Sequence, residues 1–440
     1  MPTTKTSISL KQFLKDKSCT ELTAHLFRRE SAKMTAVLVK IFGYSQMDFA
    51  EDVVQDTFSK ALQNWSLNGI PDNPSAWLYK VAKHKALDII RRNKFSESFD
   101  FSGNDRDLLN SSYSMSYAMD TLWNENTIDY DLLRMMFACC HDGISTENQI
   151  TLILKTLCGF NTKEVASALL VSEDTISKRL VRVKKFFRDK NIKPAFPGEN
   201  QLKPMVRTLL TAIYLIFNEG YHASQHDIKI RKDLLNQSMF LCKMLIENPL
   251  TAFSEVYAAL ALMCFHASRI DSRVSEKGDV ILLANQDRTL WSKELIDHGL
   301  YYMSQAAIEP YVTSYHFEAA IAYEHCSSAT FESTNWVRIL SYYDGLLAVH
   351  PSAVTALNRL IVFHQVNALK KTLEEIYVSK YKTEWESIPL FFSFLGDLYR
   401  PEDISKSKEN YQIGLAKTNS QPEKNLIQLK IDALNSTTSF

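Results

Sequence analysis

Apolar residues recur every three to four positions along most of this chain, which is the period of an amphipathic α-helix. Residues 10–94 carry this period densely and contain no strand-like alternation of useful length. From about residue 200 the chain becomes a long series of apolar segments rich in Ala, Leu and Tyr. We expect helices there at 203–219, 231–247, 251–267, 288–307, 313–326, 334–348 and 352–367. The pattern predicts an all-α protein.

Breaks in the helical period divide the chain into separate parts. Residues 95–122 are rich in Ser, Asn and Asp and show no clear period, which is typical of a linker. Pro194 and Pro197 end the second helical block, because proline cannot continue a helix interior. Paired helices after this point suggest an α-solenoid, although their period is too irregular to define a repeat. We expect two small helical domains followed by a large helical array, at 10–94, 123–193 and 200–440.

The segment from Phe49 to Phe58 predicts a helix with an acidic face. At about 100° per residue, apolar and polar side chains separate onto opposite sides. The apolar stripe contains Val54, Phe58, Ala61, Leu62 and Trp65. The opposite side contains Asp52, Gln55, Asp56 and Ser59. Packing of the stripe would hold the carboxylates outward for a basic partner, although on charge alone an ordinary solvated face is the favoured interpretation.

A basic helix is expected next, from Trp77 to Lys94. Asn73 can cap its free amides, and Pro74 fits the first helical position, where no N–H is needed. From Leu78 to Lys94 there are six Lys or Arg and one Asp, a net charge of +5. Such a stripe can follow a phosphate backbone, and Trp77 could stack on an unpaired base, although single aromatics more often belong to a core. The charged face contains Lys80, Lys83, His84, Arg91 and Lys94.

Residues 162–190 predict two short helices in the order of a helix-turn-helix motif. Thr162 can cap the first helix and Ser172 the second, with Leu170 and Val171 as the turn between them. The buried face of the second helix would contain Ile176, Leu180, Val183 and Phe187. Its outward side would carry Thr175, Ser177, Lys178, Arg182 and Lys185.

The charge of this second block supports DNA binding. From Thr162 to Lys193 there are nine Lys or Arg and four Asp or Glu, a net charge of +5. Lys178 and Arg182 could read guanine in the major groove or bind phosphate. A helical hairpin that touches no DNA is the alternative, which the absence of glycine in the turn slightly favours. The caps, the core spacing and the basic tail together favour the DNA-binding motif.

Composition limits the other possibilities. The 440 residues are 45% hydrophobic with a formal net charge of +0, so nucleic-acid binding must come from local patches. No run approaches the roughly 18 apolar residues of a membrane span, and the first residues lack the apolar core of a signal peptide, so we expect a cytoplasmic protein without a membrane partner. The seven irregularly spaced cysteines favour a reducing compartment over a disulfide framework.

Metal and enzymatic sites have little support in the sequence. Cys139, Cys140 and His141 form a cluster, but no second ligand pair of similar spacing lies nearby, so a buried helix end is the favoured interpretation. The chain has no glycine-rich phosphate loop, nucleophile elbow or His-Glu-x-x-His pattern. We expect no metal, no cofactor and no catalytic residues.

Four segments in this order resemble bacterial extracytoplasmic-function sigma factors, the small two-domain initiation factors of RNA polymerase. They are Phe49–Phe58, Pro74–Leu78, Asp88–Arg92 and Thr175–Leu180. The resemblance covers about residues 20 to 190 and accounts for both charged helices together. It implies a factor that binds promoter DNA and core RNA polymerase, at the β′ clamp and the β flap, and that directs promoter-specific transcription initiation.

The same resemblance implies roles for individual residues. The surface that docks the coiled coil of the β′ clamp would contain Glu51, Asp52, Gln55 and Asp56. The part that captures the melted −10 element would contain Asn64, Trp77, Lys80, Lys83, His84 and Arg91. The helix that reads the −35 duplex would contain Thr175, Ser177, Lys178, Arg182 and Lys185.

The rest of the chain resembles the long C-terminal extension of one subgroup of these sigma factors. The similar segments include Tyr214–Tyr221, Asn285–Trp291, Ala319–Ala322 and Thr355–Leu360. The chain departs from the subgroup after Cys-Cys-His, where the subgroup has Pro-Ala and this chain has Asp142 and Gly143. The resemblance implies a tetratricopeptide-like array that regulates the factor through a signal or a regulatory partner.

Polar residues inside the apolar segments of the array leave a second class of function open. Asn218 to His222 and the neighbours Asp287 and Arg288 could line a ligand pocket, although polar networks that fix helix packing are the favoured interpretation. The alternative protein is a helical scaffold, or a ligand-binding or enzymatic array, with an accessory DNA-binding part. The acidic helix favours the sigma factor, because a simple DNA-binding regulator does not need it.

Overall fold

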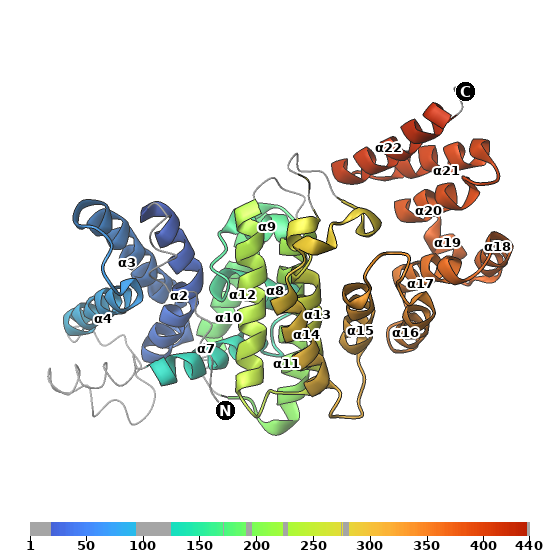
Figure 1. Cartoon of the computed structure of the whole chain (residues 1–440). Coiled ribbons are helices and arrows are strands. Elements are labelled where there is room, and N and C mark those ends of the chain that lie inside the picture. The colour runs from blue at the N-terminus through green and yellow to red at the C-terminus, as the bar shows by residue number, and fades with distance from the viewer. Residues whose placement is uncertain are drawn as a thin grey trace. The chain divides into compact units, whose positions relative to one another are not determined.

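The computed structural model describes residues 19–93, 125–169, 171–190, 196–222, 228–273, 275 and 281–437. All regular structure in these ranges is helical, so the predicted all-α class is confirmed for them (Figure 1). Contacts divide the chain into two compact units. The first unit contains residues 1–220 and 229–251, and the second contains 221–228 and 252–440.

Three helices begin the first unit. α2 (Cys19–Phe42) and α3 (Met47–Asn68) pack along each other, and α4 (Pro74–Asn93) packs on both. The apolar stripe predicted for α3 is buried except at Leu62, which is 40% exposed. Val53, which is 1% exposed, is buried in addition, because the arc that the neighbouring helices cover extends to its side of α3.

The predicted start of α4 is confirmed. The amide of Ala76 donates to Oδ1 of Asn73 at 3.0 Å, and the helix begins at Pro74. This cap satisfies one of the amides that a helix start leaves free. Asn73 and Pro74, which precede the basic face, therefore determine where α4 begins.

The second helical block follows as α7 (Glu125–Cys139), α8 (Thr146–Thr156), α9 (Thr162–Ala168) and α10 (Glu173–Lys190). α7 packs on α2, and the Lys40 ammonium donates to the buried carboxylate of Asp131 at 3.0 Å. Cys139, the last residue of α7, and the following Cys140 are both buried. The interpretation of the Cys-Cys-His cluster as a buried helix end is confirmed for the two cysteines, whereas His141 is half-buried.

The first two helices of the array belong to the first unit for nearly all of their length. They are α11 (Glu199–His222) and α12 (Ile228–Glu247). The buried Gln237 of α12 donates through Nε2 to the carbonyl of Leu157 at 3.0 Å, just after α8. The boundary between the two compact units therefore lies later in the chain than residue 200, where the sequence becomes rich in apolar helical segments. The domain boundaries proposed from the sequence stay predictions.

The second unit is a succession of helices in chain order (Figure 1). Helices packed on their neighbours in the chain run from α13 to α17, at Ser254–Ala267, Lys293–Ala306, Ser314–Ser327, Trp336–Val349 and Ala353–Val366. They continue with α18 to α22, at Leu369–Val378, Lys382–Trp385, Pro389–Tyr399, Ile404–Lys417 and Gln421–Thr437. The seven helices expected after residue 200 all have counterparts, whereas α18 to α22 were not predicted.

The segment between α13 and α14 differs from the expected helix at 288–307. It contains the short 3-10 helices η2 (Ile270–Ser272), η3 (Leu283–Asn285) and η4 (Arg288–Leu290). Asp287 accepts the amide of Thr289 at 2.9 Å, and Ser292 accepts that of Leu295 at 3.3 Å. Asp287 and Ser292 thus cap η4 and α14 separately, so the α-helix begins only at Lys293.

Three helix pairs of the second unit share one packing device, a glycine under an aromatic ring. A Cβ atom added at the glycine would collide with the ring in each case. The pairs are Gly299 with Phe265, Gly345 with Phe317 and Gly396 with Tyr411. The absent side chain lets the two helices approach closely. Around Gly396 the sequence runs Phe392, Leu395, Gly396 and Tyr399, the spacing with which a tetratricopeptide repeat begins.

Candidate polymerase and nucleic-acid interface

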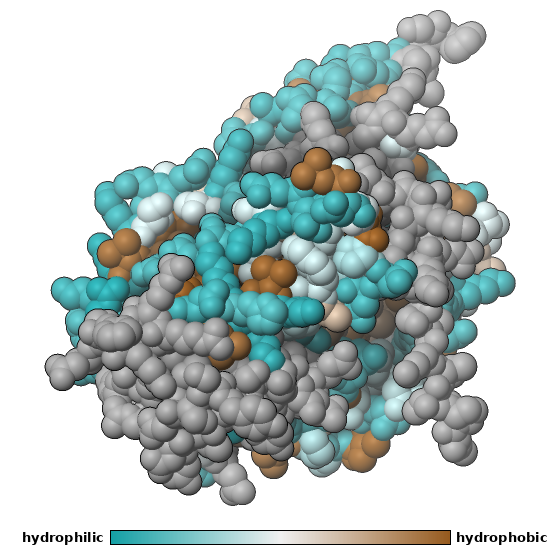
Figure 2. Space-filling model, turned by 90° about the vertical axis from the view of Figure 1, so that its left-hand side faces the viewer, coloured by the Kyte–Doolittle hydropathy of each residue, from teal (hydrophilic) through white to brown (hydrophobic). Residues whose placement is uncertain are grey.

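The acidic face predicted on α3 lies at the surface, but its four residues have different surroundings. Asp52, Gln55 and Asp56 are exposed, and Glu51 is half-buried. Glu51 and Gln55 border a cavity of about 170 Å³ that also touches α8 and the loop before α9. Figure 2 looks onto the side that carries α3 and α4, where the described surface is mostly hydrophilic. Asp52 and Asp56 are the exposed carboxylates of this face.

An ion pair links α3 to α4. The Lys85 ammonium pairs with the Asp56 carboxylate. Burial lowers the pKa of Lys85, and the neighbouring Asp52 acts in the opposite direction. The acidic face of one helix therefore adjoins the basic face of the next.

A groove of about 460 Å³ lies between the second half of α3 and α4. It brings together Asn64, Trp77 and His84, three of the six residues predicted for the −10 element. Trp77 is half-buried, with its ring centroid 5.4 Å from that of the buried Trp65 in an edge arrangement. The other lining residues are the exposed Leu67, the cations Lys60 and Lys85, the acidic Asp88, Gln63 and Val81. A groove with an aromatic ring and cations can hold an unstacked base beside its phosphate.

The other three predicted −10 residues lie outside this groove or outside the description. Lys80 is exposed and Lys83 is half-buried on α4. The backbone of Arg91 belongs to α4, but its side chain lies outside the described residues.

Sequence reasoning missed Glu30, a buried carboxylate on α2 that accepts from Tyr79 Oη at 2.8 Å and Ser75 Oγ at 3.1 Å. Glu30 therefore ties the start of α4 to α2.

The predicted helix-turn-helix consists of α9 and α10 joined through residues 169–172, of which Leu170 is not described. The predicted cap at Thr162 is wrong, because Asn161 is the capping residue. Its Oδ1 accepts the amide of Glu164 at 2.9 Å, and Glu164 returns a bond to the amide of Asn161 at 2.8 Å. This reciprocal pair satisfies two free amides, more than Thr162 could from the next position.

The faces predicted for α10 are confirmed. Ser172 accepts the amide of Thr175 at 3.2 Å. The buried side chains are Ile176, Leu180, Val183 and Phe187. Ser177, Lys178, Arg182 and Lys185 are exposed, and Thr175 is half-buried. Lys178 pairs with Asp174 at 2.6 Å on the solvent side, so part of its charge is already compensated.

α10 also packs on the first three helices. Tyr44, in the 3-10 turn η1 (Tyr44–Gln46) before α3, stacks on Phe187 with ring centroids 5.1 Å apart. Lys184 Nζ pairs with Asp48 and, at 3.0 Å, with Glu51. Burial lowers the pKa of Lys184, but Glu51 and Asp48 outweigh it and raise the pKa overall. Glu51, predicted to face polymerase, therefore contacts α10 in this structure.

The cysteine cluster has no metal-site geometry. Burial raises the pKa of both the Cys139 and Cys140 thiols, which favours the protonated form that binds metals poorly. His141 Nδ1 accepts the amide of Gly143 at 3.0 Å. Among the residues that the structure describes, no three His, Cys, Asp or Glu side chains gather to hold a metal ion.

Comparison with known proteins gives two family matches. Residues 26–96 match Sigma-70 region 2, and residues 206–307 match a family of unknown function, DUF6596. The uncharacterized protein R00370 of Rhizobium meliloti (strain 1021) is 29% identical over 331 residues, which cover 75% of this chain and 77% of that protein. No solved structure matches the chain.

The first match covers α3, α4 and the groove between them. A sigma region 2 implies binding to core RNA polymerase and promoter DNA, and it suggests a role in transcription initiation. A sigma region 2 followed by a second region is consistent with a sigma factor that has a C-terminal extension. Within the described part of the chain, no helix combines the length and apolar content needed to cross a membrane.

Proposed function

We propose that this chain is a sigma factor of the extracytoplasmic-function type, whose α3 binds the β′ clamp and whose α4 and α10 bind promoter DNA. Asp52 and Asp56 form the centre of the polymerase surface. The groove at Asn64 and Trp77 accepts an unpaired base of the −10 element. α10 reads the −35 duplex through its exposed cations and hydroxyls, beside the β flap.

The observation that carries this proposal is the junction of α3 and α4. Within the segment that matches sigma region 2, exposed carboxylates on α3 adjoin a cationic groove that contains an aromatic ring. A carboxylate face repels DNA, whereas a cationic groove attracts it. Two partners of opposite charge can therefore bind side by side on this surface.

The exposed side of α10 supports the second DNA contact. Arg182 and Lys185 are exposed on the face opposite the four buried apolar residues. Arg side chains bind guanine or phosphate in a duplex, and Ser and Thr hydroxyls bind either. These residues lie on a helix that is capped at Ser172, so its polar leading end is held rigidly.

The C-terminal extension modulates this activity in our proposal. α12, the second helix of the extension, holds the carbonyl of Leu157 through Gln237, and Leu157 lies between α8 and α9. A change in the packing of α12 would therefore reach the block that contains α10. Gln237→Leu should alter the yield of transcription without abolishing folding, because it leaves one buried carbonyl without its partner.

Run-off transcription with the purified full chain and bacterial core RNA polymerase tests the function. On a library of promoter fragments, the full chain should give discrete transcripts that core polymerase alone does not produce. Asp52→Ala with Asp56→Ala should remove the transcripts, while Ser59→Ala, an exposed change on the same helix, should retain them. Absence of any chain-dependent transcript, or equal loss in both variants, would contradict the proposal.

A further inference from the structure

A cavity of about 650 Å³ lies inside the second unit, where the segment between α13 and α14 meets α15, α16 and the start of α17. Its volume is within the range of roughly 300–1,000 Å³ that small-molecule sites occupy. Ile321 and Leu346 form an apolar part of its wall. Polar groups also converge on it, among them Tyr221, Arg269, Arg273 and Gln286.

Arg269 is the most informative residue of the cavity, because a charged side chain is rarely buried without an opposite charge. It is 7% exposed. Its Nη2 donates to Tyr221 Oη at 2.9 Å and contacts His266 Nδ1 at 3.1 Å, and its Nε is buried without a partner. Among the described residues, no carboxylate pairs with Arg269. Within the described part of the chain, the buried positive charge contacts two neutral hydrogen-bond partners and the Trp291 ring, whose centroid lies 5.7 Å from the guanidinium carbon.

A second guanidinium strengthens the positive character of this wall. Arg273 lies 3.6 Å above the ring centroid of Tyr221 and donates to the Tyr221 carbonyl at 3.0 Å. Tyr221 therefore orients both arginines, one through its hydroxyl and one through its ring. Glu318 is the one acid among the described lining residues, against these two guanidinium groups.

The N-terminal part of α17, with the residue before it, forms another wall. Ser352, Thr355 and Asn358 line the cavity there. Ser352 caps the helix by accepting the amide of Thr355 at 3.0 Å. A helix start carries partial positive charge, so this wall favours an anion as the arginine wall does.

The end of α15 brings a neutral histidine to the cavity. Burial lowers the pKa of His325 to about 4, with further lowering by Arg269 and Arg288. Its Nδ1 is buried without a partner, as is Nη2 of Arg288, whose Nη1 donates to the carbonyls of His325 and Ser328 at 2.6 Å. An uncharged imidazole can donate to or accept from a polar ligand without adding repulsion.

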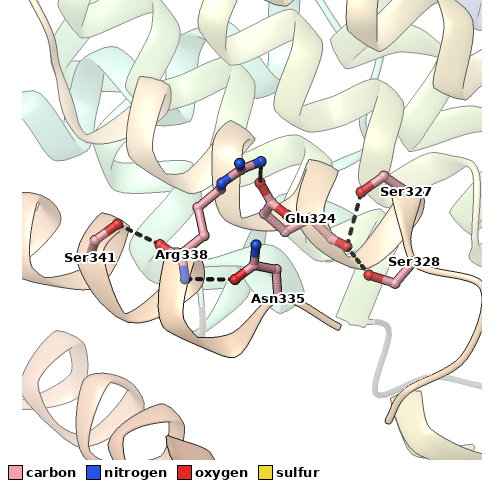
Figure 3. Close-up of polar contacts among 6 residues, drawn as sticks. All are labelled: Glu324, Ser327, Ser328, Asn335, Arg338 and Ser341. Carbon is pink, nitrogen blue, oxygen red and sulfur yellow. Dashed lines mark hydrogen bonds and ion pairs between the residues drawn. The ribbon is translucent and has the colours of Figure 1, made fainter. Parts of the chain in front are cut away.

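Neighbouring contacts hold this end of α15 in place (Figure 3). The buried Glu324 accepts from Arg338 Nη1 at 3.0 Å, which ties α15 to α16. The Glu324 carbonyl accepts from Ser327 Oγ at 3.2 Å and Ser328 Oγ at 2.7 Å. The backbone that carries His325 is therefore held by residues that do not line the cavity.

We propose that this cavity binds a small organic anion, whose carboxylate or phosphate group pairs with Arg269 and Arg273 while its body lies against Ile321 and Leu346. The anion supplies the counter-charge that the described surroundings of Arg269 lack. A bidentate contact to one guanidinium is the geometry by which arginine recognises either group. Such a site would let the C-terminal array respond to a small-molecule ligand. This inference does not depend on the sigma-factor proposal.

Isothermal titration calorimetry on the purified full chain tests the site. The probes are inorganic phosphate, citrate, succinate, glucose 6-phosphate and AMP, each at matched ionic strength, with neutral glucose for comparison. At least one anion should bind with a stoichiometry of one, and glucose should not. Arg269→Gln should weaken that binding by about 10- to 100-fold, because hydrogen bonds to charged groups are stronger than neutral ones.

Two further variants separate binding from folding. Arg400→Gln removes an exposed arginine of the same unit away from the cavity and should bind as the wild type does. Val354→Trp enlarges a 56% exposed side chain of the cavity wall and should block binding while circular dichroism stays unchanged. Failure of all five anions to bind, or wild-type binding by both Arg269→Gln and Val354→Trp, would overturn the proposal.

Discussion

The two units place positive charge in opposite settings. On α10 of the first unit, Lys178, Arg182 and Lys185 are all exposed. In the second unit Arg269 is 7% exposed and lines a cavity. An exposed row of cations suits a long polyanion that meets them one after another, whereas a buried guanidinium suits an anion small enough to enter. The depth of the charge, rather than its amount, therefore separates a macromolecular partner from a small ligand.

Charge reversal on α3 should have the largest effect. We expect Asp52→Arg with Asp56→Arg to weaken binding to core RNA polymerase by about 1,000-fold, because like charges facing each other cost several kcal/mol. Fluorescence anisotropy with labelled full chain and core enzyme measures this. Glu294→Arg with Asp297→Arg makes the same change in charge on exposed positions of α14 and should leave the affinity unchanged. Equal weakening by the two double variants would show that only net charge matters.

The acid sensitivity of the second unit should be the next largest effect. His325 is neutral when folded, with a pKa of about 4 against an ordinary value near 6.5. The unfolded chain therefore binds the proton more readily, and this contribution to stability falls as pH drops from about 6.5 to about 4, by about 3 kcal/mol in all. Hydrogen exchange of α15 between pH 7.5 and 5 measures about 2 kcal/mol of this loss.

Two histidine variants sharpen this test. His325→Gln should reduce the pH dependence of exchange in α15, since glutamine does not titrate, and should leave the part due to His316, whose pKa is also lowered by burial. His298→Gln, at an exposed position of α14, should retain the wild-type dependence. A wild-type profile in His325→Gln would mean that another group controls the acid response.

A smaller effect is expected from the glycine under Tyr411. Gly396→Ala places a Cβ against the Tyr411 ring and should destabilise the second unit by about 1–3 kcal/mol through overpacking. Gly198→Ala, at the residue before α11 in the first unit, meets nothing within 4 Å and should cost less, because it causes no overpacking. Differential scanning calorimetry of the full chains compares them. Unchanged unfolding of Gly396→Ala would show that the helix pair opens to admit a methyl group.

The smallest effect should come from a single exposed cation. Arg182→Ala should lower affinity for duplex promoter DNA by about fivefold and reduce the salt dependence, d log K/d log[salt], by about 0.9 if one phosphate contact is lost. Its binding of the small anion should not change. Arg400→Ala is the matched control for DNA binding. If Arg182→Ala weakened anion binding as much as DNA binding, the distinction between exposed and buried cations would fail.

The sequence predicts the first unit well because its signals are local. Asn73 with Pro74 marks the start of α4, and the spacing of Ile176, Leu180, Val183 and Phe187 gives the buried face of α10. Errors arise where two local signals compete. Asn161 caps α9 in place of Thr162, because the side chain of Glu164 completes a reciprocal pair only with Asn161.

The anion cavity could not be predicted because its residues lie far apart in the chain. Arg269 and Tyr221 are 48 positions apart, and helical period does not tell which helices meet. The sequence marked Tyr221 and Arg288 as polar residues in apolar surroundings, but favoured packing networks for both. Arg288 does serve packing by holding two carbonyls, whereas Tyr221 lines the cavity. Leu395, Gly396 and Tyr399 carried a repeat signal for the unpredicted α20.

The glycine pairs have a consequence for how the second unit unfolds. Gly299, Gly345 and Gly396 each join a helix to a neighbour in the chain, and the apolar cluster around Trp385 draws on α17 to α20. In such a linear array, cooperativity extends only as far as nearest-neighbour interfaces transmit it. Strain at one end can therefore melt α20 to α22 while α13 to α16 keep their fold. The array should therefore unfold in parts rather than in a single two-state transition.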